Sequence, residues 1–181
     1  MIITSDRPGV AMAAAGSAAI VAGGLVAAVT GPLALTRGSW AAAYLVLVWG
    51  VGQAAMAAAR LVAPPVAPGH APGHAPGQQS GPGPGRRGWH QLVIWNLANG
   101  LVIAGTLAAS PWVVDIGGLG CVAALVLAWS QARSLPRGAA SRAYRAVLAL
   151  MAVSIPVGLL LTHVRNAVSY THLTLPTNRE V

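Results

Sequence analysis

A few polar side chains stand inside long apolar runs of this sequence, and their types could support chemistry. Asn96 and Asn99 lie in the run WNLANG, and Gln53 lies in an earlier run. Positions i and i+3 of a helix point in neighbouring directions, so the two asparagines are expected on one face. Such amides can hydrogen-bond a neighbouring helix, or they can line a polar path for a small solute. Both interpretations of Gln53, Asn96 and Asn99 stay open, and interhelical contact is the one we favour.

A second candidate group is a charge cluster near one end of the apolar runs. Asp115 lies four residues after the turn expected at Pro111, and Arg37 and His163 are expected at the same level. A carboxylate inside a membrane is costly unless it is paired. We therefore expect Asp115 to pair with Arg37 or His163, and a proton or ion relay is the alternative.

The sequence lacks the usual catalytic constellations. It has no phosphate-binding Gly-Lys-Ser/Thr loop, no HExxH motif, no paired carboxylates and no nucleophile beside a base. The single cysteine, Cys121, excludes an intrachain disulfide and a cysteine-based zinc site. We expect no enzymatic activity, no metal and no cofactor.

Two histidines raise the question of haem. His90 and His163 are expected at opposite ends of their helices, roughly 25–30 Å apart, which is too far for one iron with bonds of about 2 Å. A haem- or quinone-linked redox subunit is therefore the third of our functional hypotheses.

Composition indicates a membrane protein. Of the 181 residues, 55% are hydrophobic and 8% are charged, with a mean hydropathy of +0.64, whereas a soluble domain has about 25% charged residues. Five apolar runs are long enough, at about 20 residues, to cross a bilayer. They are Val10–Leu35, Trp40–Val62, Trp89–Ala109, Pro111–Gln131 and Ala143–Thr162. The sequence predicts an all-α, polytopic transmembrane helix bundle of about five helices.

The basic residues, all of them arginine, predict the orientation. The net charge is +8, but the arginines lie singly or in small groups between apolar runs, so we expect no nucleic-acid partner. With five spans, one side holds Arg7, Arg60, Arg86, Arg87, Arg133, Arg137, Arg142 and Arg145, and the other holds Arg37 and Arg165. Because cytoplasmic loops carry the excess of basic residues, we expect a multi-pass protein of the cytoplasmic (inner) membrane with a cytoplasmic N-terminus.

Pro and Gly content divides the chain. Residues 1–63 are expected to form an N-terminal two-helix membrane hairpin, and residues 89–166 a three-helix membrane segment. Between them, residues 64–88 read PPVAPGHAPGHAPGQQSGPGPGRRG, a Pro/Gly/His-rich composition typical of a linker, which we place in the cytoplasm.

The last residues differ from the rest. Val168–Thr177 read VSYTHLTLPT, and this stretch resembles the translated transposon-end adapter of sequencing libraries. The resemblance implies that residues 167–181 are an adapter-derived artefact, which is excluded from fold reasoning, and that the native chain is truncated at its C-terminus.

The runs RGSWAAAYLVLVWGVGQ and WNLANGLVIAGTL resemble the small multi-pass membrane proteins of high-GC actinobacteria, and this resemblance implies no activity. Our leading hypothesis is an accessory or structural subunit that contacts the lipid bilayer and associates with other membrane subunits or with itself. The alternative is a small transporter or channel with an intramembrane polar path.

Overall fold

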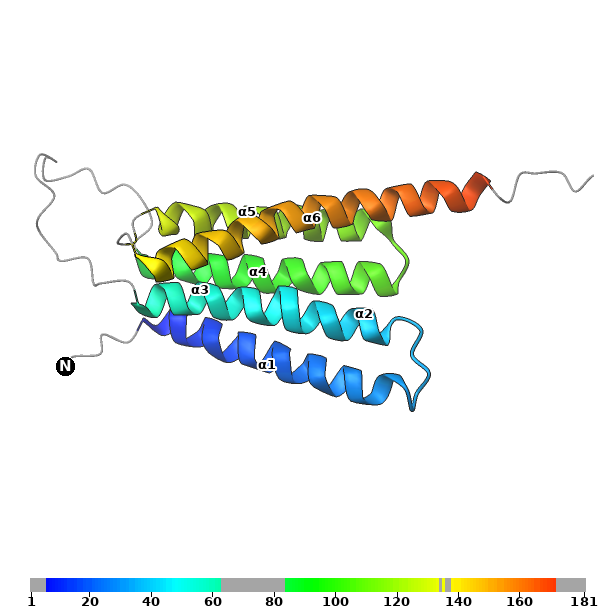
Figure 1. The fold of residues 1–181 in the computed structure, drawn as a ribbon, viewed down its shortest axis with the longest axis horizontal. Coiled ribbons are helices and arrows are strands. Elements are labelled where there is room, and N and C mark those ends of the chain that lie inside the picture. Colours follow the sequence, from blue (N-terminus) through cyan, green and yellow to red (C-terminus); the bar gives the residue numbers. More distant parts are fainter. Residues whose placement is uncertain (1–5, 63–83, 134, 136–137, 172–181) are drawn as a thin grey trace, which may run out of the picture.

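Five antiparallel helical rods along a common long axis make up the described part of the protein (Figure 1). The computed structural model describes residues 6–62, 84–133, 135 and 138–171, with only the backbone described at residues 84, 159 and 161–171. The rods are α1 (Arg7–Thr30); a continuous rod of α2 (Gly38–Ala43), η1 (Tyr44–Gly50) and α3 (Val51–Val62); α4 (Pro84–Leu107); α5 (Pro111–Ala132); and α6 (Ala139–Thr171). The predicted all-α class is confirmed.

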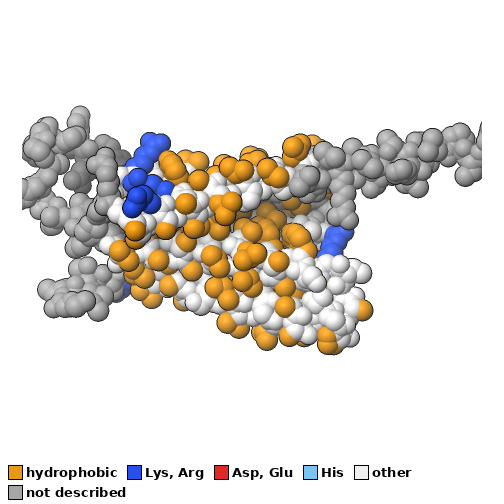
Figure 2. Space-filling model, viewed as in Figure 1, with side chains coloured by type: hydrophobic (Ala, Val, Ile, Leu, Met, Phe, Trp, Pro, Cys, Tyr) orange, Lys and Arg blue, Asp and Glu red, His pale blue; other side chains and the backbone are white. Residues whose placement is uncertain are grey.

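The two ends of the bundle differ in their connections and in their charge. At one end, residues 31–37 join α1 to α2 and residues 108–110 join α4 to α5; we call this the hairpin end (Figure 1). The opposite end, which we call the arginine-rich end, carries Arg7, Arg60, Arg86, Arg87, Arg133, Arg142 and Arg145. On the face shown in Figure 2, basic side chains lie at the two extremities of the bundle and not over its middle.

Both connections at the hairpin end follow the same helix-ending motif. Ala34 and Ala109 have positive φ values of 48° and 52°. The Leu35 N–H donates to the Thr30 carbonyl at 3.0 Å, and the Ser110 N–H donates to the Gly105 carbonyl at 2.8 Å. These are the bonds of Schellman motifs, in which one left-handed residue reverses the chain. The first rod was predicted to continue to Leu35, but the motif ends α1 at Thr30.

The outside of the described bundle is apolar, and a few polar side chains are buried within its largely apolar core. Gln53, Gln91 and Asn99 have 0% of their surface exposed, whereas large apolar side chains lie on the outside of every rod. Leu25, Leu47, Leu97, Leu119 and Leu150 are each more than 60% exposed, and Figure 2 shows apolar side chains spread over the middle of the bundle. An apolar surface around a few buried polar groups is the arrangement that lipid selects, because hydrocarbon leaves polar groups without partners.

Four helical segments are long and apolar enough to cross a membrane: Arg7–Thr30, Gly38–Val62, Pro111–Ala132 and Ala139–Gly158. The described part is therefore that of a small multi-pass membrane protein. The predicted third span, which corresponds to α4, is not among the four. Three amide side chains, those of Gln91, Asn96 and Asn99, lower its hydropathy, and two of them are fully buried.

Glycines allow the closest helix contacts. A Cβ atom at Gly117 of α5 would lie 2.7 Å from the Val102 backbone nitrogen of α4, and one at Gly105 of α4 would lie 2.7 Å from the Val114 backbone nitrogen of α5. Small residues at such positions let transmembrane backbones approach each other. The helices α4 and α5, which flank the turn expected at Pro111, therefore pack at backbone distance.

The predicted divisions of the chain fall partly outside the described residues. Residues 63–83, most of the expected linker, and residues 172–181 of the expected adapter-derived tail are not described. Residues 84–88, which were assigned to the linker, are the first turn of α4, and the α6 backbone continues through Thr171.

Candidate functional site

The two asparagines singled out in the sequence are hydrogen-bonded to the second rod. The Tyr44 hydroxyl donates to Asn99 Oδ1, and the Trp49 indole Nε1 donates to Asn96 Oδ1, both at 2.9 Å. In return, Trp95 Nε1 of α4 donates to the Trp49 carbonyl at 3.3 Å. We call these five residues, Tyr44, Trp49, Trp95, Asn96 and Asn99, the amide cluster.

Each asparagine also uses its amide N–H within α4. Asn99 Nδ2 donates to the Trp95 carbonyl at 2.8 Å, and Asn96 Nδ2 donates to the Leu92 carbonyl at 2.7 Å. These bonds to carbonyls four residues earlier orient the amides, so that each Oδ1 faces the second rod. The amide cluster therefore binds helix to helix, with both ends of each side chain in use.

The π-helix η1 presents Tyr44 and Trp49 to α4 together. Its seven residues run from Tyr44 to Gly50 and, at its end, the Val51 N–H donates to the Val46 carbonyl five residues earlier. In an α-helix, residues five apart point about 140° apart, but an i→i+5 turn holds more residues and brings their directions closer together. The π-turn thus lets Tyr44 and Trp49 reach the same helix.

Cys121 extends this cluster to α5. The thiol is buried, with 1% of its residue surface exposed, and it lies beside the Tyr44 side chain. The Tyr44 hydroxyl therefore meets side chains of both α4 and α5. Tyr44 and Cys121 were not singled out as partners in the sequence, because they lie on rods whose relative rotation depends on η1.

A second polar network lies at the arginine-rich end. Arg60 of α3 binds both carboxylate oxygens of Asp6, with Nε–Oδ2 and Nη2–Oδ1 distances of 3.0 and 3.1 Å, the bidentate geometry of strong ion pairs. Arg60 Nη1 donates to Gln131 Oε1 at 3.2 Å, and Gln131 Nε2 donates to Gln91 Oε1 at 3.0 Å. Gln91 Nε2 then donates to the Met56 sulfur at 3.0 Å.

We call Asp6, Arg60, Gln131, Gln91 and Met56 the guanidinium network. It joins the residue before α1 to α3, α5 and α4 through side chains alone. The burial of Gln91 could have been predicted from the sequence. Gln91, Trp95 and Asn99 recur every four residues, so they share one face of α4, and all three have 0% exposed surface. The partners on the other rods could not be found from spacing.

Gln53 lies apart from both groups. Its side chain is fully buried, yet neither its Oε1 nor its Nε2 has a hydrogen-bond partner among the described residues. Its Cβ lies 3.5 Å from the position that a Cβ at Gly16 of α1 would occupy, which places it at the α1–α3 contact. The structure therefore brings Asn96 and Asn99 into one cluster and leaves Gln53 without a bond to either.

The predicted charge cluster is described only in part. Arg37 is exposed just before α2, and Asp115 is half-buried in the second turn of α5. The side chain of His163 lies outside the described residues, so the pairing of these three residues stays a prediction. Among the described residues, no group of three or more His, Cys, Asp or Glu side chains could hold a metal ion.

The chemistry available in the amide cluster and the guanidinium network is hydrogen bonding between helices. Phenol, indole, amide and guanidinium groups point at one another across rods, at 2.9–3.3 Å for the nitrogen and oxygen pairs. Comparison of the chain with protein-family models, with curated proteins and with solved structures found no match. The functional assignment therefore rests on these contacts and on the membrane-spanning architecture.

Proposed function

We propose that this integral membrane protein is a non-enzymatic accessory or structural subunit of the cytoplasmic membrane. The observation that carries the proposal is the pair of bonds from Tyr44 and Trp49 to Asn99 and Asn96. A polar path for a solute needs groups that exchange partners with it, whereas these amides bond their own helix and the next one. Their contacts support a role in holding the bundle together.

All five rods cross the bilayer in this proposal, α4 included. Residues 108–110 join α4 to α5, and the two helices pack at backbone distance through Gly105 and Gly117. Because α5 is long and apolar enough to cross a membrane, α4 lies at the same depth as its neighbour. The buried amides of α4 face the neighbouring rods, while Val93, Leu97 and Leu101 are exposed on its surface.

The stability of the purified chain tests the role of the amide cluster. Replacing Tyr44→Phe removes the donor to Asn99 Oδ1, and we expect it to lower the free energy of unfolding by about 0.6–1.7 kcal/mol, the range of interhelical bonds in membrane proteins. Tyr144→Phe is the matched control, because Tyr144 is buried and none of the described hydrogen bonds involves its hydroxyl. Equal effects of the two variants would contradict the assigned role.

A second function, a small transporter or channel, is favoured by one specific observation. The buried amide of Gln53 has no described partner, and a passing water or small polar solute could supply one. Asn96 and Asn99, and Asp115 nearer the hairpin end, would be the further members of this path.

Flux through proteoliposomes separates the two functions. Stopped-flow light scattering measures the entry of water, urea and glycerol. A structural subunit should give the rate of empty vesicles. A polar path should give a faster rate that Asn99→Leu abolishes, and a faster rate that survives both Asn99→Leu and Gln53→Leu would exclude this path.

A further inference from the structure

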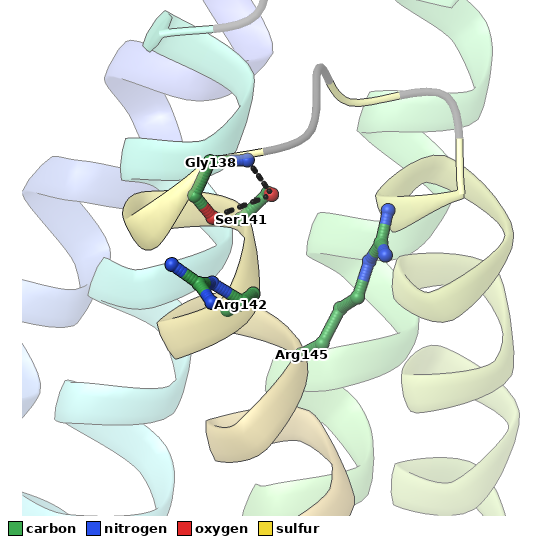
Figure 3. A pocket seen from close by; sticks show the side chains of 4 residues that line it. All are labelled: Gly138, Ser141, Arg142 and Arg145. Carbon is green, nitrogen blue, oxygen red and sulfur yellow. Dashed lines mark hydrogen bonds between the residues drawn. The ribbon is translucent and has the colours of Figure 1, made fainter.

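A cavity of about 420 Å³ opens at the arginine-rich end, beside the first turn of α6 (Figure 3). Gly138, Ser141, Arg142 and Arg145 line it. The Ser141 hydroxyl bonds both the N–H and the carbonyl of Gly138, each at 3.1 Å. Since this hydroxyl is engaged in the turn, the two guanidinium groups are the lining groups that can recognise a ligand.

The Arg145 guanidinium is held in place. Its Nε and Nη2 donate to the carbonyl of Ala132, the last residue of α5, at 3.3 and 2.9 Å, and the side chain is half-buried. Arg142 is exposed, and none of the described hydrogen bonds involves its guanidinium. The cavity thus combines one fixed arginine with one that can move to meet a ligand.

No described carboxylate balances these charges. The acidic residues within the described ranges are Asp6 and Asp115. Asp6 pairs with Arg60, and Asp115 lies in the second turn of α5, toward the hairpin end. The cavity is therefore positively charged, and it suits an anion.

The surface of α6 that follows the cavity, toward the middle of the bundle, is apolar. Leu150, Val153 and Val157 follow Arg142 at helical spacings along α6, and they are 71%, 63% and 49% exposed. The segment Ala139–Gly158 is long and apolar enough to cross a membrane, and Arg142 is its fourth residue. Arg142 and Arg145 therefore lie where head groups meet hydrocarbon.

We propose that this cavity binds the phosphate of an anionic phospholipid, whose acyl chains lie along the exposed apolar side chains of α6. Arginine binds phosphate through parallel N–H···O bonds, and basic pockets at the ends of transmembrane helices suit lipid head groups. The apolar surface next to the arginines favours a lipid over free phosphate as the source of the phosphate. The proposal holds on either side of the membrane, because it depends on local charge and depth.

Lipid titration of the full chain tests the proposal. Phosphatidylglycerol is added to the protein in phosphatidylcholine–detergent micelles, and its apparent Kd is taken from the rise in unfolding temperature. We expect Arg142→Gln to weaken binding about fivefold and Arg142→Gln/Arg145→Gln about 30-fold. The single variant guards against misfolding, because it breaks none of the described hydrogen bonds.

A matched double variant distinguishes a specific lipid site from general electrostatic attraction of anionic lipid to the protein. Arg86→Gln/Arg87→Gln removes the same charge from two exposed arginines of α4 at the same end, and we expect binding to change by less than about threefold, because salt screens charges that are not in contact. Equal weakening by the two double variants, or no weakening by either, would overturn the proposal. Inorganic phosphate added alone should not stabilise the protein, and equal protection by phosphate would overturn the lipid assignment.

Discussion

At the residue scale, two buried glutamines have opposite hydrogen-bond status. Gln91 and Gln53 both have 0% exposed surface. Gln91 donates to Met56 and accepts from Gln131, while neither amide atom of Gln53 has a described partner. An unsatisfied buried polar group costs about 1–3 kcal/mol, so we expect the same residue type to stabilise the bundle at one position and to destabilise it at the other.

Leucine substitutions at these two positions should therefore act in opposite directions. Gln53→Leu is close in size and removes two polar atoms that have no described partner, and we expect the free energy of unfolding to rise by about 1–3 kcal/mol. Gln91→Leu breaks two hydrogen bonds, and we expect a loss of about 1 kcal/mol. Unfolding in mixed SDS micelles measures both. A loss of stability with Gln53→Leu would show that this amide has a partner outside the described residues.

The sequence predicted part of this arrangement. The shared face of Asn96 and Asn99 followed from their spacing, and both residues bond the same rod. Their partners could not be predicted, because Tyr44 and Trp49 point much further apart in a regular helix than in the π-turn that this structure contains. Gln131 and Arg60 meet Gln91 from different rods, and sequence spacing carries no information about such contacts.

At the element scale, the ends of the rods depend on backbone conformations that alanine adopts poorly. Ala34 and Ala109 occupy the left-handed position of their Schellman motifs, where glycine is the usual residue because it has no Cβ. The five predicted rods were found, and a turn was expected at Pro111, but the left-handed conformation of Ala34 and Ala109 was not predicted, because alanine at a helix end gives no turn signal.

Glycine at the α4–α5 turn should stabilise the protein. We expect Ala109→Gly to raise the free energy of unfolding by about 1 kcal/mol, because it relieves the left-handed strain. Ala104→Gly, in an exposed position inside α4, should instead lower it by roughly 0.5–1 kcal/mol. Thermal unfolding in detergent measures both. If Ala109→Gly destabilises the chain as much as Ala104→Gly, then Ala109 is not left-handed.

Close packing of α4 on α5 gives a further prediction. Gly117→Ala places a Cβ 2.7–2.8 Å from backbone atoms of Val102 and Ala98, and overpacking of this kind costs about 1–3 kcal/mol. Gly24→Ala is the control, because a Cβ at that position of α1 meets nothing within 4 Å. We expect Gly117→Ala to lower the unfolding temperature and Gly24→Ala to leave it unchanged or raise it. The reverse order would contradict the α4–α5 contact.

At the scale of the whole molecule, tryptophans and arginines lie where a bilayer would place them. Trp40 and Trp112 lie near the hairpin end, and Trp89 and Trp129 near the arginine-rich end, with 37–79% of their surfaces exposed. Indole rings prefer the two membrane interfaces. All four lie near helix ends, which supports a bilayer whose plane is perpendicular to the long axis.

The arginine-rich end is predicted to face the cytoplasm. A reporter fusion with alkaline phosphatase, which is active outside the cytoplasm, should be inactive when inserted between residues 63 and 83 and active when inserted in the turn at residues 31–37. Fusions of a cytoplasm-active fluorescent protein at the same places are the control and should give the opposite pattern. An active phosphatase between residues 63 and 83 would overturn the orientation.

The unequal connections of the bundle bear on its assembly. Residues 31–37 and 108–110 are short links, so the rods on either side of each must insert as a pair, whereas 21 residues outside the described structure separate α3 from α4. Side-chain hydrogen bonds of Arg60 and of the amide cluster join the part before residues 63–83 to the part after them. Two separately translated pieces, divided between residues 63 and 83, should therefore find each other in the bilayer and rebuild the intact protein.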